Sequence, residues 1–492
     1  MTRVAQWNQV PGHLRLNFIN GQWLPAESGQ LRENIDPADL SDVIGEFTES
    51  GGVDVDHAVD AAATALPGWR AQGPLARAAH LTAASRILGE RADEVASAIT
   101  REQGKLLEEA RGEVARARAV IDFTAGQARL LGGVTAPAEE ERTFAYTFRK
   151  PIGVVGLVSP WNFPLAIPVW KVAPALLSGC TAVLKPSPLT PLTSALLVEI
   201  FQQAGVPDGV LNLVQGDAAA GEALVANPAV AGISFTGSLP VGTAIHSGGA
   251  HRLLRTQLEL GGKNALIVCD DADIGKAVDA VVNGAFGQAG QRCSATSRAV
   301  VDVRVREEFL DRLVERVAGL RVGPGDDPAS RVCPVVNTVR MDAALAAVAG
   351  ARHDGGKVLC GGEREQRADL PDGCYVQPTV IRDVPADSSL AQEEVFGPVL
   401  AVIDADGFDE AMSVANSVKY GMSGTVFTAS QSRAFEAIDR FEAGMLHVNR
   451  PGVGAYAHLP HVGSKASQYG PPECSPEVWD FYTEWHSACI SY

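Results

Sequence analysis

Basic residues are scarce in this chain relative to acidic ones. Its 492 residues include 41 Lys and Arg against 58 Asp and Glu, a formal net charge of −17. A surface of that sign repels a polyanion, because binding to DNA or RNA depends on neutralising phosphates with Lys and Arg. Nucleic acid is therefore not an expected partner.

Long hydrophobic runs are also absent. The Val-, Leu- and Ala-rich stretches are interrupted well before the ~20 apolar residues that a membrane helix needs. Residues 1–18 lack the apolar stretch of a secretory signal. The 8 cysteines include no CxxC pair and adjoin no His cluster, so neither a disulfide framework nor a metal site is expected. We expect a cytoplasmic protein outside the membrane, with reduced thiols.

Short apolar segments alternate with longer stretches from residue 143 to 270. GVVGLVSP, TAVLKPS, GVLNLVQG, GISFTGS and NALIVCD are separated by enough residues for crossover helices, which predicts a parallel sheet. A second series has helix-like residues 274–288 and 306–320 and strand-like RAVVDV, YVQPTVI, PVLAVI and GTVFT. The chain is therefore predicted to be an α/β protein with a second α/β domain after about residue 261.

The remaining segments lie outside these two series. Residues up to 130 are predicted to be mostly helical after a β-like opening at residues 16–24. Residues 141–151 alternate like an exposed ribbon, and residues 479–490 form an aromatic-rich terminal strand. Exposed strands pair with other strands, so both are candidate arms of a homo-oligomer, either dimer or tetramer.

Cys293 lies in FGQAGQRCSA, between a helix-like and a strand-like segment. Such a thiol is either a small buried hydrophobic group or a nucleophile, which needs a lowered pKa or a nearby base. QLELGGKN places Glu259 at a strand end, before two glycines that let backbone and ligand approach closely. Alone it would be a cap or turn residue, but together with Cys293 it is a candidate base.

Three other segments place polar groups after predicted strands, where open α/β sheets bind ligands. Asn162, in SPWNFPLAIPVWK, offers amide N–H donors to a developing oxyanion. LKPSPLTP contains Lys185 and Ser187, although a solvated Lys is the alternative. GISFTGSLPVG runs from a strand into a helix start without the GxGxxG fingerprint, which alone is a weak phosphate-binding signal. Its candidate N–H donors are those of Gly237, Ser238 and Gly242.

Together these segments resemble the aldehyde dehydrogenase superfamily over essentially the whole chain. The Cys loop, LELGGK, PWNFP, KPS, FTGS, EEVFGP (393–398) and YGMSGTVFT (420–428) all fall where that family has them. The resemblance implies a Rossmann-type parallel-sheet cofactor domain, a second α/β domain with the nucleophilic cysteine and a small β oligomerisation arm. The corresponding ranges are 1–140 and 152–260 for the cofactor domain, 261–470 for the catalytic domain, and 141–151 with 475–492 for the arm.

Catalytic roles are implied by the same resemblance. Cys293 would be the nucleophile and Glu259 the general base, while Asn162 and the Cys293 backbone N–H would form the oxyanion hole. Lys171 would relay protons. The thiolate would add to an aldehyde, a nicotinamide would accept hydride, and water activated by Glu259 would hydrolyse the thioester.

Cofactor contacts are implied as well. Lys185 would hold the adenosine ribose, Glu394 would bind the nicotinamide ribose and Phe396 would pack nearby. The other implied cofactor residues are Ser159, Trp161, Ser187, Gly237, Ser238 and Gly242. Many NAD-selective relatives have Glu three residues after the strand-end Lys, whereas this chain has Pro188. Without that carboxylate, NADP is expected to be accepted and weakly preferred over NAD.

Two rival functions use the same fold. Relatives that transfer the acyl group to coenzyme A generally lack a Glu at position 259, so its presence favours hydrolysis. A non-catalytic scaffold would tolerate the loss of Cys293, Glu259 or Asn162, and all three are present.

The substrate pocket departs from the family pattern. Phe163 and Trp170 resemble the aromatic residues that flank the aldehyde, but PHVGSK replaces PFGGxK, with His461 in place of Phe. This is either drift or a more polar pocket for an acidic or hydroxylated tail. Arg450 is either a partner for a substrate carboxylate or a surface arginine. GQRCSATSRAVV, NFPLAIPVWK and FYTEW resemble the branch that oxidises 2-oxoglutarate semialdehyde. GPPECS replaces that branch's GPREQG, so another polar or phosphonate-type aldehyde is the alternative.

Overall fold

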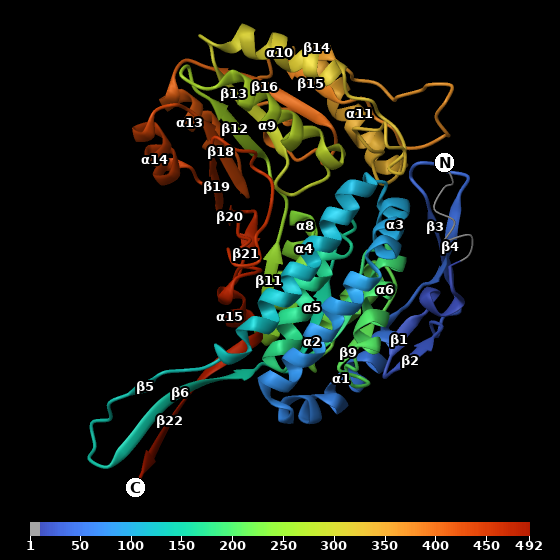
Figure 1. Cartoon of the computed structure of the whole chain (residues 1–492), viewed down its shortest axis with the longest axis vertical. Helices are drawn as coiled ribbons and strands as arrows, with labels where there is room; N and C mark the ends of the chain where they lie inside the picture. The colour runs from blue at the N-terminus through green and yellow to red at the C-terminus, as the bar shows by residue number, and fades with distance from the viewer. Residues whose placement is uncertain (1–9) are drawn as a thin grey trace.

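Two helix-covered sheets and a projecting arm make up the computed structural model, which describes residues 10–492 (Figure 1). Residues 1–9 of the expected cofactor domain lie outside the described residues. The lower sheet in Figure 1 has eight strands in the order β2-β1-β9-β8-β7-β10-β11-β21. They are β1 (Asn17–Ile19), β2 (Gln22–Leu24), β7 (Val154–Val158), β8 (Thr181–Lys185), β9 (Leu211–Leu213), β10 (Val230–Thr236), β11 (Arg255–Glu259) and β21 (Gln468–Tyr469).

The central strands of this sheet are parallel and buried, as the apolar runs predicted. Strands β9, β8, β7, β10 and β11 run in one direction, and every residue of β7 and β8 is buried. Lys185 pairs with Val158, and Thr236 pairs with Glu259, at the carboxyl ends of their strands. This register places the predicted ligand-binding residues along one edge of the sheet.

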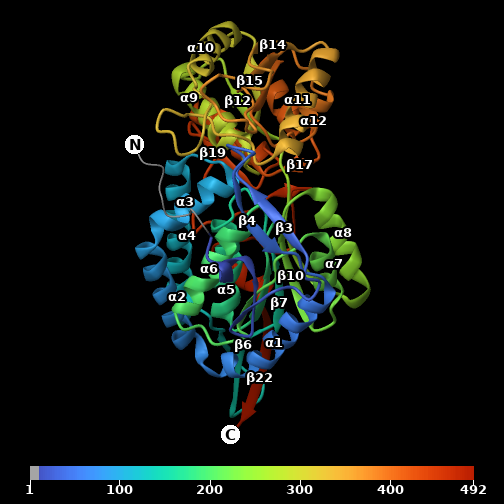
Figure 2. The same cartoon turned by 90° about the vertical axis from the view of Figure 1, so that its right-hand side faces the viewer.

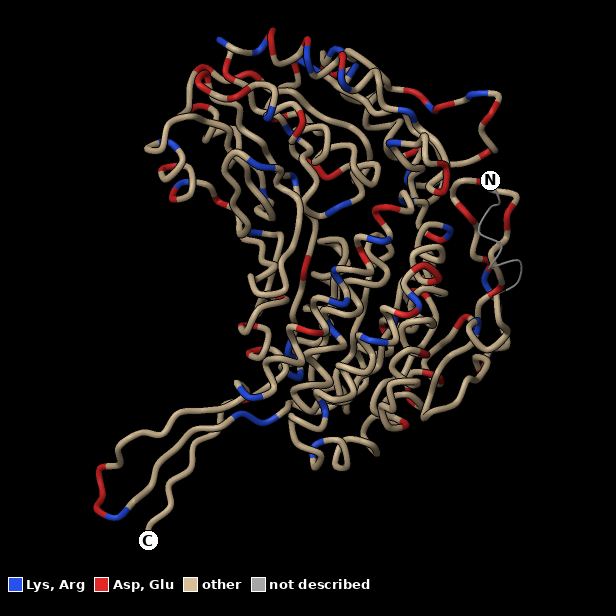
Figure 3. The backbone as a smooth tube through the Cα atoms, viewed as in Figure 1, with Lys and Arg blue, Asp and Glu red and all other residues tan. Residues whose placement is uncertain are grey.

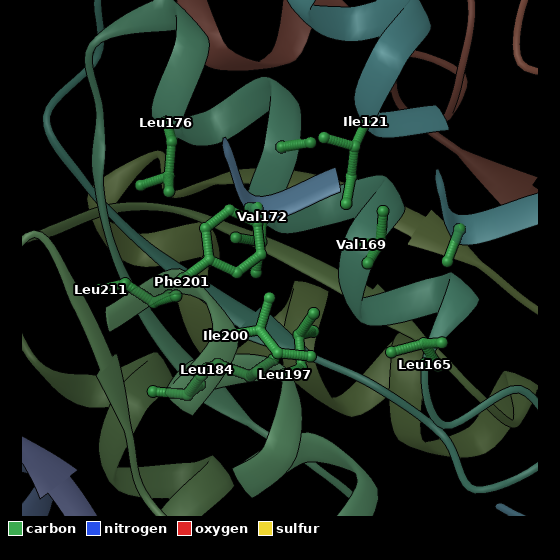
Figure 4. Packing of buried hydrophobic residues seen from close by; sticks show 14 of the residues in the cluster. Ile121, Leu165, Val169, Val172, Leu176, Leu184, Leu197, Ile200, Phe201 and Leu211 are labelled. Carbon is green, nitrogen blue, oxygen red and sulfur yellow. The ribbon is translucent and has the colours of Figure 1, made fainter. Parts of the chain in front are cut away.

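Helices cover both faces of the sheet (Figure 2). They are α1 (Gly52–Ala71), α2 (Gly73–Glu90), α3 (Ala92–Gln103), α4 (Leu107–Gly126), α5 (Ala166–Ser178), α6 (Pro191–Gln203), α7 (Ala218–Ala226) and α8 (Leu239–Gly249). Ile121, Val172 and Phe201 pack together with Leu184 and Leu211 of the sheet (Figure 4). The core therefore holds α4, α5 and α6 against β8 and β9.

A hairpin interrupts the region that was expected to be mostly helical. Strands β3 (Leu31–Ile35) and β4 (Val43–Thr48) pair antiparallel before α1 begins. Four of the five β3 residues are exposed, including Leu31 and Ile35. Because the only buried residue of β3 is Asn34, this strand has no apolar face and its sequence shows no clear strand periodicity.

The upper sheet has seven strands in the order β14-β15-β16-β13-β12-β18-β19. They are β12 (Asn264–Val268), β13 (Thr296–Asp302), β14 (Lys357–Cys360), β15 (Thr379–Arg382), β16 (Val399–Ala405), β18 (Ser423–Phe427) and β19 (Met445–Val448). The helices of this part are α9 (Ile274–Phe286), α10 (Arg306–Ala318), α11 (Thr338–His353), α12 (Ser389–Gln392), α13 (Phe408–Asn416) and α14 (Gln431–Arg440). A small pair, β17 (Tyr420–Gly421) and β20 (Ser464–Lys465), lies outside this sheet.

The arm is an antiparallel sheet that projects away from both large sheets (Figure 1). Its strands are β5 (Thr135–Ala136), β6 (Thr143–Pro151) and β22 (Thr483–Ser491). The terminal strand expected over residues 479–490 begins only at Thr483, because residues 479–482 form a helical turn, α15 (Trp479–Tyr482). Trp479, Phe481 and Tyr482 are buried in the core beside α5, and exposure starts after them.

Candidate active site

A tight turn precedes Cys293 and fixes the position of the loop that carries it. It follows the short helix η5 (Gly287–Gly290) and precedes β13. Gln288, Ala289 and Gly290 have φ angles of 53°, 52° and 70°, so three consecutive residues adopt the left-handed conformation. A Cβ at Gly290 would lie 2.4 Å from the backbone oxygen of Gly397. Position 290 therefore requires glycine, and the turn fixes the start of the Cys293 loop.

The glycines after Glu259 allow this loop to approach closely. A Cβ at Gly262 would lie 2.5 Å from the backbone oxygen of Cys293, and one at Gly261 would lie 2.4 Å from Glu394 Oε2. The structure therefore brings LELGGK, the Cys loop and EEVFGP together, although they are far apart in the sequence.

Cys293 and Glu259 meet around one histidine. The His461 Nε2 atom lies 3.8 Å from Cys293 Sγ and 3.5 Å from Glu259 Oε2. Glu259 comes from the end of β11, Cys293 from the loop before β13, and His461 from the segment before β20. The thiol and the carboxyl group that the sequence singled out therefore meet at one imidazole nitrogen, and the region around these three side chains is called the pocket below.

Burial dominates the electrostatics of this trio. It raises the pKa of the Cys293 thiol, and the nearby Glu259 raises it further. Burial also raises the pKa of Glu259 well above its usual value, Glu473 adds to that effect, and Lys171 opposes it. Neither carboxylate oxygen of Glu259 accepts a hydrogen bond within residues 10–492. A desolvated carboxyl group with a raised pKa is suited to accept a proton near neutral pH.

Asn162 lies in the turn between β7 and α5 and is 3% exposed. Its Nδ2 donates to the backbone oxygen of Gln291, 3.1 Å away, next to the Cys293 loop. Its own backbone oxygen accepts a hydrogen bond from Lys105 Nζ at 2.8 Å. Lys105 is fully buried and pairs with Glu113, 2.6 Å away. This pair holds the turn in place, and sequence reasoning missed it because its residues come from a different helical region.

Lys171 is buried in α5 beside the same pocket. Its Nζ donates to Ser234 Oγ at 2.9 Å and forms a short ion pair with Glu473. Both Lys171 and Glu473 influence the pKa of Glu259 through their charges, so the pair lies close to that carboxyl group. Glu473 was missed from the sequence, although GPPECS retains the Glu of the related GPREQG motif.

The expected adenosine contacts lie at the carboxyl end of β8. Lys185 is buried, and its Nζ donates to the backbone oxygens of Pro186 and Gly216 at 2.8 and 2.9 Å. Burial lowers the pKa of Lys185 to about 8. Ser187 Oγ follows the strand and accepts a hydrogen bond from the Leu189 N–H at 3.3 Å. Lys185 and Ser187 thus lie near the same edge of the sheet. At neutral pH the amine of Lys185 is charged.

The start of α8 faces the same edge. The N–H of Gly237 donates to the backbone oxygen of Glu259 and that of Gly242 donates to Ser238, both at 3.0 Å. These two expected donors are therefore used within the protein. The N–H groups of Ser238 and Leu239, at the start of the helix, have no intrahelical partner and can face an anion.

Other observations also fit a dinucleotide at this edge. The buried Ser159 Oγ lacks a hydrogen-bond partner in the described part of the chain. Glu394 accepts a hydrogen bond from the Gly262 N–H at 2.8 Å, and burial raises its pKa to about 7. Phe396 has a φ angle of 57° and packs edge-on against Trp161, with 5.3 Å between ring centroids. Thus the expected nicotinamide-side residues lie beside the Cys293 loop.

The expected substrate residues divide into two groups. Trp170 lies beside His461, with 4.9 Å between ring centroids, and Phe163 lies under Lys105 Nζ at 4.3 Å from its ring centroid. Arg450 is exposed and donates to Tyr456 Oη at 2.6 Å. The structure therefore places the two aromatic residues near the site and gives Arg450 a phenol partner.

Arg116 of α4 is a further cation near the pocket that sequence reasoning missed. It has no hydrogen-bond or ion-pair partner within the described range, residues 10–492. Burial and the nearby Arg292 lower its pKa, and its charge helps to lower the pKa of His461. The helical segment RGEVARARAV carries several arginines, so its sequence could not indicate which of them faces the pocket.

Residues 10–492 contain neither a membrane-spanning helix nor a cluster of metal ligands. None of the helices there is long and apolar enough to cross a membrane. The same residues contain no group of three or more His, Cys, Asp or Glu side chains placed to hold a metal ion.

Known proteins match this chain in sequence and in fold. The model of the aldehyde dehydrogenase family matches residues 23–488. The chain is 38% identical over 469 residues to an alpha-ketoglutaric semialdehyde dehydrogenase of Bacillus subtilis (strain 168), covering 95% of this chain and 96% of that one. It is 39% identical over 476 residues to an alpha-ketoglutarate semialdehyde dehydrogenase of Haloferax volcanii, with coverage of 95% and 97%.

Solved structures of other proteins have the same fold as this chain. An NADP dependent enzyme of E. coli superposes with a TM-score of 0.94 at 34% identity, covering 97% of this chain and 98% of that one. Betaine aldehyde dehydrogenase of Staphylococcus aureus in complex with NAD+ also gives 0.94, at 32% identity with coverage of 97% and 95%. The chain therefore belongs to the aldehyde dehydrogenase family, which confirms the predicted α/β fold class. The protein is an aldehyde dehydrogenase, and its family uses NAD or NADP.

Proposed function

We propose that this enzyme oxidises a small anionic semialdehyde, such as 2-oxoglutarate semialdehyde, to its carboxylic acid with NAD(P)+ and water. The meeting of Cys293 and Glu259 in one pocket is the observation that carries this proposal. A thiol can form the covalent acyl intermediate, and a buried carboxylate can activate the water that hydrolyses it. Glu259 favours hydrolysis over transfer to coenzyme A.

The side chains of the site divide the steps of this reaction among them. The Cys293 sulfur attacks the aldehyde carbon, and the Cys293 N–H with the second amide N–H of Asn162 stabilises the oxyanion. A bound nicotinamide supplies the two-electron acceptor. Glu259 then takes a proton from water as the water attacks the thioester. Lys171 and Glu473 carry that proton away from the pocket.

The unpaired charge of Arg116 supports an anionic substrate. The Arg116 guanidinium is half-buried and has no carboxylate partner among residues 10–492, so a substrate carboxylate could bind it with paired hydrogen bonds. Two relatives at 38% and 39% identity are named for alpha-ketoglutarate semialdehyde, a substrate with this chemistry. We expect Arg116→Met to raise KM for 2-oxoglutarate semialdehyde by about tenfold or more, with little change for propionaldehyde.

Two matched variants accompany that test. Arg111→Met removes an exposed arginine of the same helix, which pairs with Asp93, and should leave both substrates unchanged. Arg450→Met tests the cation that the sequence suggested. Selective loss of the anionic substrate in Arg450→Met, but not in Arg116→Met, would assign the tail-binding role to Arg450.

Acceptance of NADP is also proposed. Pro188 leaves no carboxylate to repel a 2′-phosphate, and Lys185 and Ser187 lie at the same strand end. One structural relative is described as NADP dependent and another holds NAD+. A large kcat/KM preference for NAD over NADP would contradict this part of the proposal.

A homo-oligomer assembled through the arm is proposed as well. Phe144, Trp485 and Ile490 on the arm are 45%, 55% and 51% exposed, and β22 is an edge strand with one unpaired side. Between its tip and its base the arm carries almost no charge (Figure 3). An uncharged ribbon with an open edge is suited to pair with a second copy.

All 8 cysteines are free thiols, which supports a reducing, cytoplasmic location.

One experiment tests the central proposal. Reduced nicotinamide formation is measured with NAD and NADP, without coenzyme A, for 2-oxoglutarate, succinate and phosphonate-type semialdehydes, betaine aldehyde and aliphatic aldehydes. Cys293→Ala is the inactive control. Preference for uncharged long-chain aldehydes would contradict the anionic-tail proposal, and preference for the phosphonate would select the alternative substrate. Silence across the panel would favour a non-catalytic scaffold.

A further inference from the structure

One imidazole nitrogen lies between the two side chains to which the reaction is assigned. His461 Nε2 faces both Cys293 Sγ, at 3.8 Å, and Glu259 Oε2, at 3.5 Å. We propose that His461 is a further catalytic residue, which takes the thiol proton of Cys293 through Nε2 and passes it to Glu259. This inference rests on the roles proposed above for Cys293 and Glu259.

The ring of His461 is held in this position from several sides. The residue is 5% exposed, and its ring packs against Trp170 at an interplanar angle of 56°. Its backbone N–H donates to the backbone oxygen of Glu473 at 2.8 Å, and the Glu473 N–H donates to the backbone oxygen of His461 at 3.2 Å. The other ring nitrogen, Nδ1, has no hydrogen-bond partner in the part of the chain that the structure describes. Nε2 is thus the nitrogen placed for chemistry.

The proton transfer balances without an external reactant. With the ring proton on Nδ1, the Nε2 lone pair faces the sulfur and takes the proton as the S–H bond breaks. The sulfur keeps the electron pair and forms the C–S bond with the aldehyde carbon, whose carbonyl electrons move to oxygen. The new N–H bond then breaks as an O–H bond forms on Glu259, and Glu259 releases this proton toward Lys171 and Glu473 before it takes a proton from water. The imidazole is neutral again and ready for the next turnover.

The charged groups around His461 suit a transient carrier. The ring lies beside Cys293 and Glu259, and the backbone of His461 pairs with that of Glu473. Arg116 of α4 and Lys171 of α5 are near enough for their charges to act on the ring. Burial, followed by the charges of Arg116 and Lys171, lowers the pKa of His461 to about 4. The ring is therefore neutral at pH 7 and gives up a proton readily, whereas the raised pKa of Glu259 lets its carboxyl group keep one.

The thiol needs such help because its surroundings oppose ionisation. Burial and Glu259 raise the pKa of Cys293, so few molecules hold a free thiolate at neutral pH. A base in contact with the sulfur makes the thiolate only when a substrate is attacked. The Phe of the related PFGGxK pattern has no nitrogen, so this route is specific to chains with His at this position.

Alkylation of Cys293 by iodoacetamide tests the inference without any aldehyde. The rate is followed for the Cys293 peptide by mass spectrometry from pH 6 to 10 in the wild type, His461→Phe and His461→Gln. Phe keeps the ring, and Gln keeps a polar group that cannot carry a proton. We expect both variants to react about tenfold or more slowly at pH 7 and to need higher pH. His80→Phe, which removes a half-buried His packed on Trp69, should react like the wild type.

Stopped-flow measurement of the first turnover adds a second readout. Both His461 variants should lower the rate of the reduced-nicotinamide burst, because the thiol step precedes it. Wild-type alkylation in His461→Phe, or full rescue by His461→Gln, would overturn the proton-transfer role. A higher KM for the anionic aldehyde with unchanged alkylation would make His461 a specificity residue instead. If His461→Phe does not fold, as judged by its thermal midpoint against His80→Phe, the Gln variant decides.

A wrong substrate proposal gives a different result. The aldehyde panel would then be silent or favour another compound, while the alkylation difference between the wild type and the His461 variants would persist. Failure of the inference would leave the panel intact and remove that difference.

Discussion

At the scale of single residues, the sequence could indicate which side chains carry chemistry, but not how they face one another. Cys293 and Glu259 were found because each stands in a motif whose neighbours suit its task. His461 was noticed only as a replacement in that pattern, and its contact with both residues depends on a fold that joins three distant segments. Arg116 and Glu473 have no local signal of comparable strength.

Replacement of Glu259 should separate the two halves of the reaction. In Glu259→Gln we expect the first turnover of reduced nicotinamide to remain, while steady-state kcat falls by roughly 10²–10⁴-fold, because the amide cannot take a proton from water. Stopped-flow absorbance measures the first turnover, and steady-state absorbance measures kcat. A variant that turns over at the wild-type rate would show that another group activates the water.

The dependence of kcat on pH, compared between the wild type and Glu259→Gln, shows in which direction the protonation of Glu259 acts. Since burial raises the pKa of Glu259, its carboxyl group is protonated and inactive as a base on the acid side. We expect wild-type kcat to rise with pH through that raised pKa, and this limb should be missing from Glu259→Gln. An identical acid limb in both proteins would assign the titration to a different group.

Lys185 should make the affinity for NADP depend on pH. Its pKa, lowered to about 8 by burial, means that the amine is charged at pH 7 and largely neutral at pH 9. We expect KM for NADP to rise over this range by several-fold more than KM for NAD, because only NADP presents a 2′-phosphate to the amine. In Lys185→Met the two cofactors should respond alike. Equal responses in the wild type would show that the amine does not contact the phosphate.

At the scale of elements, hydrophobic periodicity predicted the buried strands well, and the irregular segments poorly. The runs that became β7, β8 and β12 are mostly apolar and are buried throughout, because both faces of the sheet are covered. The β3–β4 hairpin and the turn α15 escaped prediction, since the first has mostly exposed residues in β3 and the second takes its aromatic residues into the core. The left-handed turn before Cys293 is likewise a tertiary feature.

Substitution of Gly290 should show how strongly that turn positions the thiol. Gly290→Ala places a Cβ 2.4 Å from one backbone oxygen and 2.8 Å from another, so the loop must move. We expect a loss of unfolding free energy above the ~1–2 kcal/mol cost of the left-handed conformation alone, with slower alkylation of Cys293. Gly355→Ala is the matched control, because its φ is +95° and no atom lies within 4 Å of the added Cβ. Equal effects of the two substitutions would mean that the contact at Gly290 relaxes easily.

At the scale of the whole molecule, the arm is the part whose form is least explained by a single chain. Strands β6 and β22 pair over nine positions, yet they project away from both cores (Figure 1). A two- or three-stranded ribbon without a packed face is marginally stable in water. The alternating residues 141–151 predicted this exposed ribbon, but a sequence cannot show what covers it.

Substituting the apolar arm pair Phe144 and Ile490 tests assembly while keeping the strands paired. The two residues lie opposite each other, so Phe144→Glu with Ile490→Lys replaces an apolar pair by opposite charges that still attract across the strands. We expect the molar mass from light scattering at micromolar concentration to fall below the wild-type value, because a partner would have to desolvate both charges. Phe435→Glu changes a more exposed Phe, 66% exposed in α14 and away from the arm, and should leave the mass unchanged. A wild-type mass for the double variant, or a fall in mass for Phe435→Glu alone, would place the subunit interface elsewhere on the molecule.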